Sequence, residues 1–143
     1  MFPFTTGRAY DSMLKDTTDS RYKVGQVWSY KARPGEEHSF FQVVKVENHP
    51  KLGNIIHIAM RGLKMRNPSS PIGISENVNH MPFSEEAINK SALKILKEKA
   101  ELPDYEEGYQ QWREAFEAGN AGIYTITVSE AVTVMEATLK RLE

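Results

Sequence analysis

Hydrophobic and polar residues alternate in three short runs within the first half of the chain. The runs cover residues 24–31, 39–46 and 55–64, and all three are rich in β-branched and aromatic side chains. A period of two is typical of strands with one buried face. Pro34 and Gly35 separate the first two runs and suit the centre of a tight turn. Such short connections favour an antiparallel meander, or a small and partly open barrel.

The alternation also assigns faces to these strands. The core face predicted for the second run comprises Phe40, Gln42, Val44 and Val46. In the third run, His57 shares a face with Arg61, in the middle of the most apolar segment of the chain. The opposite face of that run is predicted to be scaffold, with Ile56, Ile58 and Met60.

The second half of the chain shows helical periodicity instead. Ser84 suits the N-cap of a helix that we expect to run to about residue 100. A second helix is expected to end at Gly119, and Ser129 is expected to cap a last one. Between them, residues 122–128 have the composition of a strand.

Residues 66–82 show no clear element. We predict a long loop there, of a kind that is often functional in a compact domain. The alternative is a short extra strand at residues 72–75.

These elements follow the order β-β-β-(loop)-α-α-β-α. The predicted fold is α+β, with an antiparallel β-meander or small partly open barrel packed against two or three helices. Residues 21–143 have the size of a single domain. Residues 1–20 show neither period and are expected to form a loosely ordered arm.

Composition and motifs exclude several kinds of chemistry. The 143 residues include no cysteine, which excludes disulfides, thiolate nucleophiles and cysteine-ligated metals. No apolar run has the length of a membrane span or leader, so we expect a cytoplasmic protein. Glycine-rich phosphate loops, His-Glu-x-x-His and Gly-x-Ser-x-Gly are all missing. We therefore predict no cofactor, no metal and no catalytic residue, and lean against an enzyme.

Three polar residues are the candidates for a ligand-binding site: His57, Arg61 and His80. If the His57 face lines a cleft, its imidazole and the Arg61 guanidinium suit an anion or acid–base chemistry near neutral pH. His80 lies just before the expected N-terminus of a helix, where backbone N–H groups receive anions. The alternative is that both histidines are structural.

Aromatic side chains recur at helical spacing near the C-terminal end. Tyr105, Tyr109, Trp112 and Phe116 are four, three and four residues apart. Such a stripe suits a core, a protein interface or a platform for stacked bases. Tyr105, Tyr109 and Trp112 are the candidates for an interaction surface, with a protein partner or a second copy of this chain as the occupant.

Charge is divided unevenly along the chain. Residues 1–66 carry a net charge of +5 and residues 67–143 a net charge of −6. A basic half can bind nucleic acid by releasing counterions, although the two halves can also pack together and cancel. The bases that would serve a nucleic-acid module are Lys23, Lys31, Arg33, Lys45, Arg61 and Lys64.

Four segments together resemble small bacterial proteins that carry no assigned function: residues 24–30, 56–58, 80–84 and 122–131. The resemblance spans about residues 22–140 and implies no catalytic residue. The first three strands also resemble SH3-like barrels, a fold too common to imply a function. We favour a non-enzymatic binding or protein-interaction domain. The alternatives are a nucleic-acid-associated β-module and a small enzyme with a pocket formed by His57, Arg61 and His80.

Overall fold

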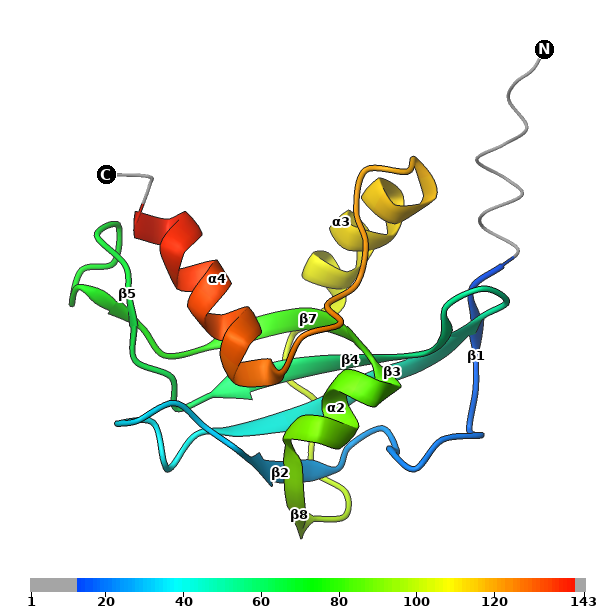
Figure 1. Cartoon of the computed structure of the whole chain (residues 1–143), viewed down its shortest axis with the longest axis horizontal. Coiled ribbons are helices and arrows are strands. Elements are labelled where there is room, and N and C mark those ends of the chain that lie inside the picture. The colour runs from blue at the N-terminus through cyan, green and yellow to red at the C-terminus, as the bar shows by residue number, and fades with distance from the viewer. Residues whose placement is uncertain (1–12, 141–143) are drawn as a thin grey trace.

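One open antiparallel sheet organises the molecule (Figure 1). The computed structural model describes residues 13–140. The sheet has six strands in the order β7-β4-β3-β2-β8, with β1 also paired to β3. Its strands are β1 (Lys15–Asp16), β2 (Val27–Tyr30), β3 (Phe40–His49), β4 (Gly53–Arg61), β7 (Val78–Ser84) and β8 (Ala92–Lys97). The α+β class is confirmed, and the sheet does not close into a barrel.

Three helices cover the two faces of the sheet. In Figure 1, α2 (Glu85–Ser91) and α4 (Val128–Lys140) lie in front of the strands, and α3 (Glu106–Glu117) lies behind them. A separate two-stranded ribbon, β5 (Met65–Arg66) and β6 (Ile74–Ser75), packs beside α4. None of the helices in the described part of the chain is long and apolar enough to cross a membrane.

The apolar core lies between the sheet and the pair α2 and α4. Its strand residues come from β2, β3, β4, β5 and β7, and both helices contribute small or branched side chains. The predicted scaffold face of β4 is confirmed, because Ile56, Ile58 and Met60 are fully buried there. We call this side of the sheet the apolar face. The side under α3 is called the α3 face.

Several local predictions hold. The Ser84 hydroxyl accepts a hydrogen bond from the Ala87 backbone N–H at 3.2 Å, which makes Ser84 the N-cap of α2. Gly119 follows α3 with a φ of 81°, the left-handed conformation expected of a helix end. The last helix is capped by Thr127 rather than Ser129, since Thr127 and Glu130 exchange hydrogen bonds in a capping box.

The prediction of a helix that runs to about residue 100 is wrong beyond Ser91. The chain leaves α2 and continues as β8, which pairs with β2 and completes the edge of the sheet. Two irregularities interrupt this pairing, so Ala92 and Ile95 lie opposite successive core residues of β2. Both side chains pack against the apolar core although they are three residues apart. A bulged strand therefore produced the spacing that indicated a helix.

The segment 66–82, predicted as a loop, contains more regular structure than expected. The alternative strand at residues 72–75 is found as β6 at Ile74–Ser75. The segment ends in β7, which pairs with β4 along the edge of the sheet. The strand predicted at residues 122–128 is also wrong. That segment makes a single parallel bridge, between Phe83 and Tyr124, before α4 begins at Val128.

The core face predicted for β3 is only partly right. Phe41 and Val43 are fully buried in the apolar core, on the face that had been assigned to the outside. A bulge lies at Val44, because the pairing with β4 shifts between Val43 and Lys45. Beyond the bulge Val46 returns to the core. Lys45 and Glu47 consequently face α3.

Candidate functional site

A chain of hydrogen bonds joins three adjacent strands beneath α3. The Nε2 of His57 on β4 lies 2.8 Å from a Glu47 carboxylate oxygen on β3. The Nδ1 of His57 lies 2.8 Å from the Nε2 of His80 on β7. Glu47 and His57 are fully buried, and His80 is partly buried. The sequence thus brings two of the three predicted ligand-binding candidates into direct contact.

Local backbone geometry explains how these side chains meet. Lys45 pairs with His57 and Glu47 with Ile55, so Glu47 is the diagonal neighbour of His57 across the β3 and β4 hairpin. Without the bulge at Val44, alternation would have placed Glu47 on the apolar face with Val43. Pro82 pairs with His57 on the other side, which places His80 next along the same face.

Helix α3 closes the site from above. The Tyr109 hydroxyl donates to the second Glu47 oxygen at 2.6 Å, and the Arg113 guanidinium donates to the Tyr109 oxygen at 3.1 Å. The rings of Tyr109 and Trp112 meet the His57 ring edge-on, with centroids 5.1 and 5.0 Å away. Aromatic rings therefore enclose the Glu47 and His57 part of the chain and shield it from water, while His80 at the other end is partly exposed.

The charges of the three groups follow from this enclosure. Burial alone would raise the pKa of Glu47, but hydrogen bonds from His57 and Tyr109 lower it, so the carboxylate is ionised. Burial lowers the pKa of His57. Burial, with the neighbouring His57, lowers the pKa of His80 to about 3. At neutral pH both imidazoles are neutral.

These charges fix the direction of the hydrogen-bond chain. An ionised carboxylate only accepts, so the proton of His57 lies on Nε2 and its Nδ1 is an acceptor. His80 must then donate from Nε2, and its own Nδ1 keeps a lone pair. Every buried side-chain polar atom of the described residues has a hydrogen-bond partner, and Nδ1 of His80 has none, so this atom is open to solvent.

His80 lines a shallow pocket of about 520 Å³ between β7 and the first turns of α3. Asp104 and Glu107 also line it, and no lysine or arginine of residues 13–140 does. Gly108 allows the close approach of the helix, because a Cβ there would lie 3.2 Å from the Cβ of His80. The pocket is thus negatively charged, with a neutral acceptor in its wall.

The other predicted residues lie around this centre. Arg61 does not reach the imidazoles, because its guanidinium donates to the Asn79 side chain and the Met60 carbonyl. Tyr109 and Trp112 are buried under α3, and Tyr105 lines a separate hollow. Sequence reasoning missed Glu47. An acidic residue near a short turn, diagonally across a hairpin from a buried histidine, was the signal that could have found it.

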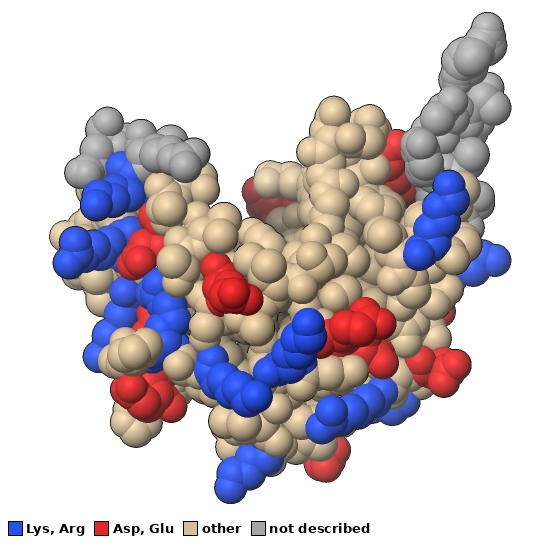
Figure 2. Space-filling view, in the orientation of Figure 1, with Lys and Arg blue, Asp and Glu red and all other residues tan. Residues whose placement is uncertain are grey.

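Basic side chains are dispersed rather than gathered. Figure 2 shows Lys and Arg interspersed with Asp and Glu over the visible face. Arg33 is paired with Glu36 and Glu136, and Lys45 is paired with Asp16. Within residues 13–140, no group of three or more His, Asp or Glu side chains is arranged to hold a metal ion.

Comparison with protein-family models, with curated proteins and with solved structures gives no match. The fold and the site under α3 are therefore the basis on which a function can be proposed.

Proposed function

We propose that the protein is a binding module that recognises a positively charged N–H group, such as an amine or a guanidinium, in the pocket beside His80. The direction of the hydrogen-bond chain carries this proposal. With Glu47 ionised and His57 fixed between the two groups, Nδ1 of His80 is left as an acceptor, and His80 lines the pocket.

The surrounding charges support a cationic ligand. Asp104 and Glu107 line the pocket, and among the described residues no lysine or arginine lines it to balance them. A ligand ammonium or guanidinium group would donate to His80 and be attracted by both carboxylates. Because His57, His80 and their neighbours are already held in place by α3, the acceptor would be pre-organised and would cost little ordering on binding.

Two other functions have weaker support. In a small enzyme His80 would act as a general base, but an imidazole with a pKa of about 3 is a weak base at neutral pH. In a nucleic-acid module the bases should be free and clustered, whereas Arg33 and Lys45 are held in ion pairs. Both stay predictions.

NMR titration with three small amides tests the proposal: N-acetyl-lysine methylamide, N-acetyl-arginine methylamide and the neutral N-acetyl-norleucine methylamide. We expect the two cations to shift signals of β7 and α3, and the norleucine derivative to shift neither. Glu107→Gln should weaken binding of the cations about fivefold, since a partly solvated charge pair contributes ~1 kcal/mol.

Glu106→Gln is the matched control. Glu106 is the preceding residue of α3, is exposed and does not line the pocket. It should leave binding unchanged. Equal weakening by both substitutions would reveal general attraction to the acidic helix end, and equal shifts from the norleucine derivative would reveal no recognition of charge. Either result contradicts the proposal.

A further inference from the structure

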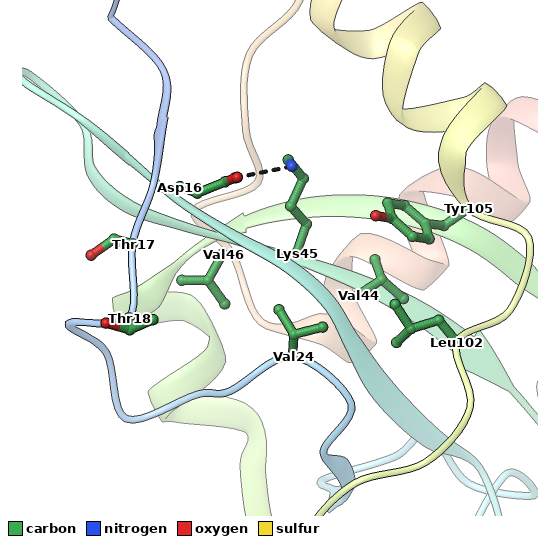
Figure 3. Close-up of a pocket in the computed structure, with 9 residues that line it drawn as sticks. All are labelled: Asp16, Thr17, Thr18, Val24, Val44, Lys45, Val46, Leu102 and Tyr105. Atoms are coloured by element: carbon green, nitrogen blue, oxygen red, sulfur yellow. Dashed lines mark ion pairs between the residues drawn. The ribbon is translucent and has the colours of Figure 1, made fainter.

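A second hollow lies on the α3 face, between the β1 segment and the chain that leads into α3 (Figure 3). Its volume is about 400 Å³, within the range of small-molecule sites. It shares no lining residue with the pocket beside His80.

The walls of this hollow combine polar residues of the β1 segment with apolar residues that are partly open to water. Val24 is 47% exposed and Leu102 is 37% exposed, and both line the same space. Val44 and Val46 of β3 also line it, and Figure 3 shows Val44 beside Leu102 and Val46 on the side of Thr18. Exposed apolar side chains that converge on one concave space favour a ligand with an apolar body.

Among the described residues that line the hollow, Lys45 is the one cation. The Nζ of Lys45 lies 3.0 Å from a carboxylate oxygen of Asp16 and 5.1 Å from the centroid of the Tyr109 ring. The Lys45 side chain is 23% exposed, whereas that of Asp16 is 76% exposed. The ammonium group is therefore held against the protein, and its partner carboxylate reaches it from a two-residue strand at the surface.

We propose that this hollow binds a small monocarboxylate with an apolar body, whose carboxylate takes the place of Asp16 on Lys45. The apolar body lies against Val24 and Leu102. When no ligand is bound, the Asp16 carboxylate is paired with the Lys45 ammonium group. It therefore competes with the ligand carboxylate for Lys45. The pairing of β1 with β3 through only two residue pairs allows Asp16 to withdraw.

The test compares 3-phenylpropionate with its neutral analogue 3-phenylpropanamide by NMR titration of the whole chain. We expect both to shift signals around Val24 and Leu102, with the amide about tenfold weaker because it lacks a charge-assisted hydrogen bond. Lys45→Met should abolish the preference for the carboxylate, and Lys45→Arg should keep it. Asp16→Asn should tighten binding of the carboxylate, because the competing anion is removed.

Lys51→Met is the matched control, since Lys51 is an exposed lysine outside the hollow. It should leave the preference intact. The proposal is overturned if the carboxylate and the amide bind equally, if Lys51→Met has the effect expected of Lys45→Met, or if the shifts map outside the hollow. Neither probe carries a positive charge, so the outcome is independent of the amine titration at His80.

Discussion

The two faces of the sheet are buried by opposite kinds of side chain. The apolar face packs Phe41, Ile58 and Met81 against α2 and α4, and its cluster contains no carboxylate, histidine, lysine or arginine. The α3 face buries Glu47 and His57 in the same sheet, one strand position away from those apolar residues. Both sides are largely buried, but only the cluster under α3 contains a chain of polar hydrogen bonds with a fixed direction. Beside α4, the buried carboxylate Glu36 is neutralised by an ion pair with Arg33.

This difference separates what stabilises the fold from what positions α3. Hydrophobic burial is non-directional and tolerates changes of geometry, so the apolar face holds the sheet and two helices together. A buried hydrogen-bond network contributes only when each donor meets its acceptor. The position of α3 therefore depends on the protonation states of Glu47, His57 and His80, and the stability of the apolar face does not.

The largest effect is expected on the apolar face. Phe41→Ala removes a ring that is 0% exposed and packs near Trp28 and Tyr30. We expect the free energy of unfolding to fall by about 3–5 kcal/mol, from lost burial and the cavity left behind. Urea denaturation at pH 7 measures this. Leu93→Ala, at an exposed position of β8, should change it by less than about 0.5 kcal/mol. Similar losses for both would refute the assignment of the core.

A pH dependence should distinguish the α3 face. The folded-state pKa values of His57 and His80 lie below their ordinary value of 6.5. The unfolded chain therefore binds more protons below pH 6.5, and stability is lost as pH falls through that value. For His80 alone the slope approaches about 1.4 kcal/mol per pH unit well below 6.5. Urea denaturation between pH 6.5 and 5 measures the slope before most carboxylates titrate.

Two variants test whether this pH dependence of the free energy of unfolding arises on the α3 face. His80→Asn removes a titrating imidazole and keeps an N–H group that can donate to His57, so the slope should decrease. Phe41→Ala should lower stability by the same amount at each pH and retain the wild-type slope. A slope unchanged by His80→Asn would place the pH dependence elsewhere, for example at His49, whose pKa is also lowered by burial.

Bulges explain which parts of the fold could be predicted from the sequence. The cap at Ser84, the long strands β3 and β4 and the end of α3 follow from local signals that the structure leaves intact. Three bulged or irregular pairings place core residues three apart instead of two: Val43 and Val46, Val78 and Met81, Ala92 and Ile95. A spacing of three imitates a helix or hides a strand, and the partner strand that fixes it is distant in sequence.

The same reasoning applies to the site. His57 and His80 are recognisable because a histidine within an apolar strand, or next to a helix start, is chemically unusual. Glu47 is not recognisable by alternation alone, since its orientation depends on the bulge at Val44. Its contact with Tyr109 depends on how α3 crosses the sheet. Both features depend on the tertiary structure and leave no signal in the local sequence. They decide which candidate residues come into contact.

The smallest effect concerns the contact between α3 and His80. In a helix interior, replacing glycine by alanine usually stabilises by about 0.5–1 kcal/mol. At Gly108 the added Cβ would lie 3.2 Å from the Cβ of His80, closer than such atoms normally approach. Gly108→Ala should therefore give no stabilisation, or a small loss, because α3 or His80 must move. Thermal and urea denaturation of the variant measure the balance.

Exposed Gln110 in the same helix supplies the reference for this substitution. The difference in stability between Gln110→Ala and Gln110→Gly gives the helix propensity term for α3 without a neighbouring strand. If Gly108→Ala stabilises by that full difference, an alanine side chain fits between α3 and His80. Close packing at Gly108 then does not hold the imidazole in position. If the gain is lost and the signals of His57 and His80 shift, close packing by Gly108 holds the acceptor in place. The packing of α3 on His80 then depends on the absence of a side chain at one glycine, whereas the stability of the apolar face is distributed over many side chains.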